Sequence, residues 1–252
     1  MKHQQSEQGE KKVSFGFREV PESEKEKDVR QVFDSVAKKY DLMNDLLSFG
    51  LHRLWKRHAI QRAEIKRDDK VLDIASGTCD LALASAMKIG EKGEIWATDI
   101  NHAMLSEGAK RLKRSGATVR VVQCDCEKLP FADNMFDVVT VSFGLSNMTH
   151  KETALAEMLR VTKTGGRVLV LEFSHCWKVL RPLYDFYSFS VMPRLGALVA
   201  GDAQSYRYLA ESIRMHPDQE TLATMMRKVG FSKVSWENLT FGVCALHIGK
   251  KL

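Results

Sequence analysis

Short apolar runs alternate with helix-like patterns through the middle of the chain. The run Lys70-Val-Leu-Asp-Ile74 ends at a polar turn, and residues 81–88 then carry apolar side chains at helical spacing. Strands that alternate with helices are typical of a parallel sheet with right-handed crossovers. The pattern therefore predicts an α/β fold. Its parallel strands are expected at residues 70–74, 93–99, 118–123, 136–142 and 166–173.

Helices and a hairpin are expected around this central unit. Apolar residues at helical spacing predict helices over residues 29–39, 51–63, 179–215 and 219–229. Two strand-like runs, 233–239 and 243–248, then close the chain. Their connection around Gly242 is too short for a parallel crossover, so they are expected to pair as an antiparallel hairpin. The sheet would then have seven strands and be mostly parallel.

The chain is expected to form one domain after a tail. Its 252 residues, 44% of them hydrophobic, suffice for a full core. The charge-rich residues 1–27 are expected to be a flexible tail, and residues 28–252 the domain. Within it we expect N-terminal helices over 28–66 and a helical insertion over 175–216, after the fifth strand.

Neither a membrane span nor a signal peptide is expected. No apolar run approaches the roughly 18 residues of a spanning helix, and residues 1–10 lack the apolar core of a signal peptide. The five cysteines are scattered and odd in number, which favours reduced thiols without a bound metal. We therefore expect a cytoplasmic protein with no metal site.

The net charge of +6 leaves three classes of partner open. Lys and Arg number 38 against 32 Asp and Glu, an excess that suits nucleic acid, anionic lipid or an acidic protein. Part of it lies between Arg53 and Arg67, where Glu64 is the single acid. This basic cluster is either a membrane-facing patch or ordinary solvated charge.

The turn after the first strand carries the first chemical signal. Between Asp73 and Asp80 it has one glycine, Gly77, where a dinucleotide fingerprint has three. A nucleoside without phosphates needs less, namely close backbone approach at the glycine, free N–H groups and an acid for the ribose. Asp99, at the end of the second strand, is that acid. S-adenosylmethionine has the matching groups.

The order of these features is more informative than any one of them. Asp125 and Cys126 follow the third strand, where they could face an adenine edge. Taken singly, an acid that ends a strand is more often a helix cap, and a lone glycine is ordinary loop punctuation. Their succession at strand ends favours a methyltransferase of the Rossmann-like class.

Several longer runs carry a more specific signal. One is Leu46-Leu-Ser-Phe-Gly-Leu-His-Arg-Leu-Trp-Lys56, and others are residues 33–44, 142–145, 171–174 and 201–220. With them the chain resembles the ubiquinone/menaquinone biosynthesis C-methyltransferase family from about Phe15 to the C-terminus. The resemblance implies a class I methyltransferase fold and S-adenosylmethionine as cofactor. It also implies C-methylation of a polyprenylated methoxybenzoquinol and of demethylmenaquinol.

The resemblance places the cofactor contacts at Thr78, Asp99, Asp125 with Cys126, and Ser142. With the turn, the expected cofactor-binding set is Asp73, Gly77, Thr78, Asp99, Asp125, Cys126 and Ser142.

Two positions depart from the family pattern. Cys79 stands where the family commonly has glycine, and its sulfur is expected to crowd the methionine end of the cofactor if its φ is positive. Ser146 stands where the family usually has an arginine, proposed there to help organise the group that takes the substrate's proton. The alternative function is therefore a cofactor-binding scaffold in a quinone biosynthetic assembly, with weak or no activity.

The main candidates for catalysis are Asn147, Tyr206, Arg207 and His216. Asn147 could orient a water or the substrate hydroxyl. Tyr40, Asp41 and Asn44 come from one segment that could close over the sheet, and Tyr206, Arg207 and His216 come from another. Each of the last three also has a packing interpretation. Tyr206 could be an ordinary core aromatic, Arg207 an ion-pair partner, and His216 a cap of the last helix.

The aromatic segment Trp177–Leu198 bears on how a lipid substrate would be bound. It predicts either a helix that packs on the sheet or the lining of an apolar channel for a prenyl tail. A lipid substrate implies peripheral contact with the inner face of the membrane. Other quinone biosynthesis enzymes and a second copy of the chain are further expected partners, whereas nucleic acid is not.

Overall fold

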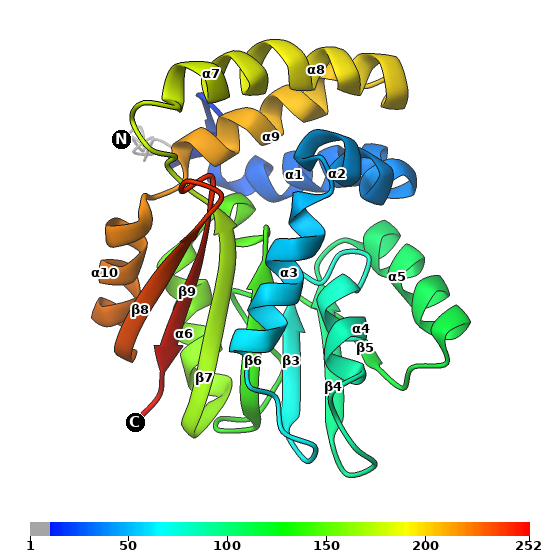
Figure 1. The fold of residues 1–252 in the computed structure, drawn as a ribbon, viewed down its shortest axis with the longest axis vertical. Helices are drawn as coiled ribbons and strands as arrows, with labels where there is room; N and C mark the ends of the chain where they lie inside the picture. The colour runs from blue at the N-terminus through cyan, green and yellow to red at the C-terminus, as the bar shows by residue number, and fades with distance from the viewer. Residues whose placement is uncertain (1–10) are drawn as a thin grey trace, which may run out of the picture.

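A seven-stranded sheet runs through the centre of the molecule (Figure 1). The computed structural model describes residues 11–252. The strand order is β5-β4-β3-β6-β7-β9-β8. The strands are β3 (Lys70–Ile74), β4 (Glu94–Asp99), β5 (Arg120–Gln123), β6 (Phe136–Ser142), β7 (Thr162–Phe173), β8 (Ser232–Leu239) and β9 (Cys244–Lys250).

The strand directions confirm the predicted mixture of parallel and antiparallel pairing. Strands β3 to β7 pair in parallel, while β9 is antiparallel to both β7 and β8. β3 lies between β4 and β6, so the chain changes direction along the sheet at this point. Ligands of open α/β sheets bind at the carboxyl ends of the strands beside such a switch point.

Alternate residues of the strands build two cores, one on each face of the sheet. Val71 and Leu169 pack on one face with α3, α4 and α5, whereas Leu72 and Val168 pack on the other with α6 and α10. This is the period of two that a strand imposes on its side chains. These helices are α3 (Leu51–Arg62), α4 (Asp80–Ala86), α5 (His102–Ser115), α6 (Lys151–Val161) and α10 (Gln219–Val229).

A separate helical layer lies beyond the carboxyl ends of the parallel strands, at the top of Figure 1. It consists of α1 (Glu22–Val36), α2 (Tyr40–Ser48), α7 (Arg181–Phe186), α8 (Met192–Leu195) and α9 (Ala203–Met215). A 3₁₀ turn, Ala37–Lys39, joins α1 to α2, and π-helical turns at Tyr187–Val191 and Gly196–Ala200 flank α8. The layer covers the edge of the sheet at which ligands are expected.

The prediction of a flexible tail over residues 1–27 is wrong for residues 11–27. Residues 11–21 form a small antiparallel hairpin of β1 (Lys12–Phe15) and β2 (Arg18–Pro21), and α1 begins at Glu22. Phe15 is buried and stacks on Tyr208 of α9, with ring centroids 4.1 Å apart. This apolar contact orders a segment whose charge alone predicted solvation. Residues 1–10 lie outside the described residues.

Candidate functional site

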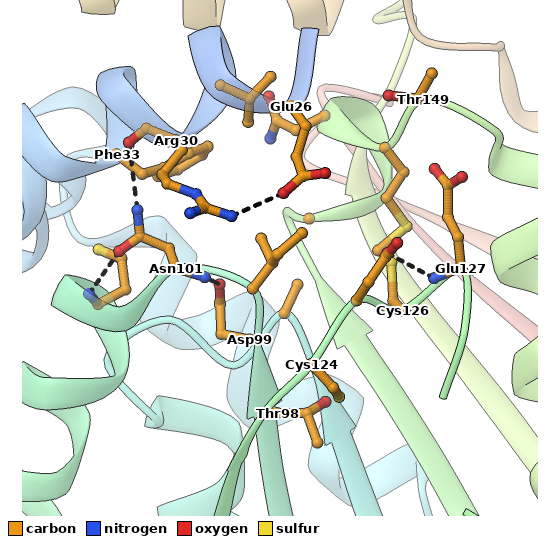
Figure 2. Close-up of a pocket in the computed structure, with 18 of the residues that line it drawn as sticks. Glu26, Arg30, Phe33, Thr98, Asp99, Asn101, Cys124, Cys126, Glu127 and Thr149 are labelled. Carbon is orange, nitrogen blue, oxygen red and sulfur yellow. Dashed lines mark hydrogen bonds and ion pairs between the residues drawn. The ribbon is translucent and has the colours of Figure 1, made fainter. Parts of the chain in front are cut away.

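A cavity of about 280 Å³ lies at the carboxyl ends of β3, β4 and β5, beneath α1. Figure 2 shows the ends of these strands with Asp99, Cys124 and Cys126 on one side and Arg30, Glu26 and Phe33 of α1 on the other. The sheet therefore supplies one wall of the cavity and the helical layer supplies the opposite wall.

The turn after β3 fixes the carboxylate that reaches this cavity. Gly77 has a φ of +54°, and a Cβ there would lie 3.1 Å from the methyl carbon of Met104, which also lines the cavity. The Gly77 N–H donates to Asp99 Oδ2 at 2.8 Å, and the Asn101 N–H donates to Asp99 Oδ1 at 2.9 Å. Burial raises the pKa of Asp99. Its carboxylate is thus held in place, with further lone pairs left for a ligand.

The lining of this first cavity is mainly acidic. Five carboxylates line it, against the cationic Arg30 and the imidazole of His150. Arg30 pairs with Glu26 at 2.7 Å, and His150 contacts Glu22 and Glu127, each at 2.7 Å. These pairs leave Asp99 and Asp125 as the carboxylates without an ion pair among the described lining residues. A ligand with a positive charge suits this lining.

A second cavity of about 230 Å³ lies between α2, α3, the segment from α7 to α9 and the loop after β8. Aromatic and aliphatic side chains make up most of its lining, including Leu47, Trp55, Phe143, Phe173, Tyr187 and Met192. From the aromatic segment Trp177–Leu198, Tyr184, Tyr187 and Met192 line this cavity. Such a lining suits an apolar ligand.

Tyr40 and Asn147 line both cavities. Asn147 ends the 3₁₀ turn Leu145–Asn147 after β6, and its Oδ1 accepts a hydrogen bond from the Tyr208 hydroxyl at 3.2 Å. The adjacent Ser146 N–H donates to the buried Glu172 Oε2 at 3.1 Å. Burial raises the pKa of Glu172 to about 7. The two cavities thus meet at Asn147, and a hydrogen bond to Glu172 of β7 holds the turn that carries it.

Four of the predicted cofactor residues line the first cavity and three do not. Gly77, Asp99, Asp125 and Cys126 line it. Asp73 is buried below the turn, where Oδ1 accepts from the Thr140 hydroxyl at 2.7 Å. The Thr78 hydroxyl donates to Asp41 of α2 at 2.8 Å. Ser142 lines neither cavity. Asp73, Thr78 and Ser142 thus lie outside the first cavity.

Of the predicted catalytic residues, Asn147 alone lines the two cavities. Tyr206 is buried in an apolar cluster with Val36 and Met43, as the packing interpretation has it. Arg207 faces a different groove, beside Phe17 and Glu211. His216 is buried at the end of α9, where burial lowers its pKa. Tyr206 and Arg207 face different surroundings because successive side chains along a helix such as α9 point in different directions.

Cys79 does not crowd the first cavity. Its φ is +63°, as anticipated, but its side chain is fully buried among residues of α3, α4 and α5. A Cβ added at Gly108 of α5 would lie only 2.5 Å from its sulfur. The sulfur therefore points at α5 and away from the site. This removes one of the two reasons for considering a scaffold without activity.

The sequence reasoning named Tyr40 and Asn44 as residues that could close over the sheet but missed the other contacts of the N-terminal helices. Arg30, Phe33 and Tyr40 line the first cavity, and His52 lines the second. The available signal was the resemblance over residues 33–56, which marked these helices as specific to the family without assigning a role to Phe33 or His52.

A family model fits the chain over residues 20–251, and its description is the ubiE/COQ5 methyltransferase family. The chain belongs to this family. It is therefore an S-adenosylmethionine-dependent C-methyltransferase of ubiquinone and menaquinone biosynthesis.

Full-length relatives agree with the ubiE/COQ5 assignment. The ubiquinone/menaquinone biosynthesis C-methyltransferase UbiE of Cupriavidus metallidurans is 60% identical over 237 residues, which make up 94% of this chain and 98% of that protein. UbiE of Burkholderia mallei is 60% identical over 240 residues, 95% of this chain and 99% of that protein.

Solved structures of more distant proteins have the same fold as this chain. A methyltransferase of Thermotoga maritima matches with a TM-score of 0.66 at 18% identity, covering 89% of this chain and all (100%) of that one. The [4+2]-cyclase SpnF matches with a TM-score of 0.64 at 17% identity, covering 88% and 94%. Since one fold serves both chemistries, these likenesses speak for the architecture alone.

The first cavity fits the cofactor of the ubiE/COQ5 family. S-adenosylmethionine supplies an activated methyl group on a sulfonium cation, and the acidic lining suits that charge. Asp99 has lone pairs for two ribose hydroxyls, and Gly77 leaves open the space that a Cβ would fill. Ile100, Met104 and Cys126 offer apolar surface for a purine. These residues would hold the cofactor.

Proposed function

We propose that this chain methylates a ring carbon of a polyprenylated quinol, with the cofactor in the first cavity and the quinol ring in the second. The observation that carries the proposal is that Tyr40 and Asn147 line both cavities. A methyl donor and a ring held on the two sides of this junction have their reacting atoms facing each other. The substrates implied by the family are a polyprenylated methoxybenzoquinol and demethylmenaquinol.

Positioning is the main task of the residues at the junction. Methyl transfer needs the donor, the methyl group and the ring carbon in line, and fixed placement supplies much of the rate enhancement. Asn147 offers its amide N–H₂ to a ring hydroxyl, because its Oδ1 already accepts from Tyr208. Burial raises the pKa of Tyr40 to about 12, so its hydroxyl stays protonated and donates. Both groups orient the quinol oxygens.

The second cavity also suits the start of the prenyl tail. Phe49 lines it and is 80% exposed, which marks an opening to the surface beside α2. Its ring lies 6.0 Å from that of Tyr187, between centroids. A tail too long for the cavity would leave between these two rings.

The test is a methylation assay with the purified protein. Reduced demethylmenaquinol and S-adenosylmethionine are incubated with it, and mass spectrometry follows the gain of one methyl group on the ring. We expect turnover by the wild type and a fall of about a hundredfold in kcat for Asn147→Ala. Cofactor binding by calorimetry without quinol turnover would contradict the proposal and favour a scaffold. Methylation of RNA instead of quinol would contradict it as well.

We further propose that the outer helical layer contacts the membrane surface. Among residues 11–252, no helix has both the length and the hydrophobicity to cross a bilayer. In the turn before α7, Val179 is 90% exposed, and on α7 itself Leu183 and Phe186 are 69% and 61% exposed. Their spacing of four and three residues suits one helical face, while the neighbouring Tyr184 and Tyr187 line the second cavity. An apolar face beside the opening suits a lipid surface.

The charges around this face suit anionic lipid. Lys178, Arg181 and Arg194 are exposed on the same segment. Its acid Asp185 is paired with Arg214 of α9. Cationic side chains that flank an apolar face strengthen binding to anionic membranes.

The predicted basic cluster at residues 53–67 contributes less than expected. Arg62 pairs with Glu237 at 2.6 Å, Lys56 with Asp80 at 2.8 Å and Arg53 with Asp45 at 2.6 Å. These internal ion pairs use charge that the sequence counted as available to a membrane. The location at the inner face of the membrane, a second copy of the chain and other biosynthetic enzymes as partners stay predictions.

A further inference from the structure

The second cavity has few groups that can accept a proton. Its titratable lining side chains, among the described residues, are His52 and the tyrosines Tyr40, Tyr184 and Tyr187. Burial raises the pKa of all three tyrosines, that of Tyr40 to about 12. Protonated phenols donate hydrogen bonds and are poor bases at neutral pH. Among the described residues that line the second cavity, His52 is therefore the candidate base.

His52 is oriented by a fixed carboxylate. It is 4% exposed and lies on α3, with Nε2 2.9 Å from Asp45 Oδ1 of α2. Asp45 is itself held by Arg53, whose Nε and Nη2 donate to its two oxygens at 2.6 and 2.7 Å. The carboxylate accepts, so this contact assigns the ring hydrogen to Nε2. A base oriented by a carboxylate is a recurring catalytic arrangement.

The other ring nitrogen of His52 is without a partner. Nδ1 is buried and has no hydrogen-bond partner in the described part of the chain. With the hydrogen on Nε2, Nδ1 carries the free lone pair. Buried polar atoms without a partner are uncommon in folded proteins and call for an explanation. Because His52 lines the second cavity, a hydroxyl of a ligand bound there would supply the missing partner.

The surroundings favour the neutral imidazole. Burial lowers the pKa of His52, Asp45 of α2 raises it, and Lys56 and Arg53 of α3 lower it. The net direction is downward, so the ring is unprotonated at neutral pH and is able to accept a proton.

We infer that His52 is the general base that takes the phenolic proton of the quinol, and that Asp45 is its positioning residue. This inference rests on the proposed function. The proton passes from the quinol oxygen to Nδ1, and the O–H electron pair stays on the substrate and increases the electron density at the adjacent ring carbon. That carbon forms the new C–C bond as the S–CH₃ bond breaks, and the electron pair of the broken bond goes to sulfur.

The remaining steps close the balance. The methylated carbon loses its hydrogen as a proton, which restores the aromatic ring and reprotonates the ring oxygen. His52 then releases the proton it took to solvent. One proton is released for each methyl group transferred, and no oxidant or reductant is needed.

The decisive variant is His52→Gln. The glutamine amide can still donate to Asp45 but has no basic nitrogen. We expect kcat to fall about a hundredfold or more, while the Kd for S-adenosylmethionine measured by calorimetry stays within twofold, which shows that the fold is kept. His58→Gln is the matched control, because His58 lies on the same helix and contacts Glu237 Oε2 at 2.7 Å, outside both cavities. It should retain wild-type turnover.

Substrate acidity separates a base from a structural histidine. For a quinol analogue with an electron-withdrawing ring substituent, the phenol ionises without help, so the deficit of His52→Gln should shrink by at least tenfold. Asp45→Asn should lower kcat less than His52→Gln does and shift the acidic limb of the pH profile. A deficit that is the same for both quinols would overturn the inference, as would turnover of His52→Gln within twofold of wild type. Inactive wild type would instead count against the proposed function.

Discussion

At the scale of single residues, Cys79 shows how a local departure from the family pattern is accommodated. A non-glycine residue at its φ of +63° costs about 1–2 kcal/mol. Its sulfur is buried against α5, where Gly108 leaves the necessary space. The strain is thus offset by burial in the core, on the side of the turn that faces away from the cofactor cavity.

Two substitutions at Cys79 separate strain from burial. Cys79→Ala keeps the strained backbone and loses the buried sulfur, whereas Cys79→Gly removes both. We expect the glycine variant to exceed the alanine variant in free energy of unfolding by about 1 kcal/mol, as measured by urea denaturation. Both should keep the wild-type Kd for S-adenosylmethionine. A tighter Kd for Cys79→Gly would show that the sulfur reaches the cofactor after all.

Glu172 makes the stability of the fold depend on pH. Burial raises its pKa from 4.5 to about 7 in the folded state, so folding favours its protonated form. Its contribution to stability is full below about pH 4.5 and is lost as pH rises through about 7. Urea denaturation should therefore show that the free energy of unfolding of Glu172→Gln increases relative to that of the wild type between about pH 5 and about pH 8.

Glu157 provides a control of opposite sign. The Arg160 side chain lowers the pKa of Glu157, so the stabilising effect of this carboxylate is lost as pH falls. Glu157→Gln should approach the wild type in stability toward acid pH. A pH-independent difference for Glu172→Gln would contradict the assignment of a raised pKa.

At the scale of elements, α2 is tied to the sheet by a group of charges around the turn after β3. Arg111 of α5 donates to both Asp41 of α2 and Asp80 of α4, and the Thr78 hydroxyl also donates to Asp41. Because α2 carries Tyr40, these contacts fix one wall of the first cavity. Thr78 therefore links the turn after β3 to α2.

Loosening α2 should weaken cofactor binding. Arg111→Gln removes the charge that joins Asp41 to Asp80, and we expect the Kd for S-adenosylmethionine to rise about tenfold. Hydrogen exchange across residues 40–48 should become faster. Lys110→Gln is the matched control, since Lys110 is exposed on the same helix and pairs only locally, with Glu107 at 2.7 Å. Equal effects of both substitutions would refute a specific role for the Arg111 contacts.

At the scale of the whole molecule, the proposed membrane contact would explain both the net charge of +6 and the exposed apolar side chains of the outer helical layer. Vesicle co-sedimentation tests it. The double variant Leu183→Glu, Phe186→Glu should bind vesicles containing phosphatidylglycerol at least about tenfold more weakly than wild type. Its turnover of a short-chain, water-soluble quinol should be unchanged. Met87→Glu is the control, because Met87 is 82% exposed at the end of α4, away from this layer.

The charge and apolar contributions can be separated in the same assay. Arg181→Gln and Arg194→Gln should each weaken binding to anionic vesicles by about fivefold and leave binding to neutral ones unchanged. Wild-type binding by the double glutamate variant would refute membrane contact through α7. A dimer that the double variant abolishes in sedimentation would instead identify this face as an interface between copies.

The sequence predicted the sheet closely because its signal is local. The apolar runs Lys70–Ile74 and Phe136–Ser142 and the turn at Gly77 can be recognised from residues that are neighbours along the chain. The same holds for Asp99, which ends its strand. The predicted helix over residues 29–39 includes the 3₁₀ turn Ala37–Lys39, and α2, Tyr40–Ser48, was not predicted as a separate helix.

The sequence by itself determined the α/β order of elements, the family, the cofactor and part of the cofactor cavity. Tertiary structure alone decided which residues meet across that order. It brought Tyr40 and Asn147 to one junction, turned Tyr206 and Arg207 away from it and placed His52 against Asp45 in an apolar cavity. The physical reason is that backbone pattern fixes the direction of a side chain within its own element, whereas packing between elements fixes what it faces.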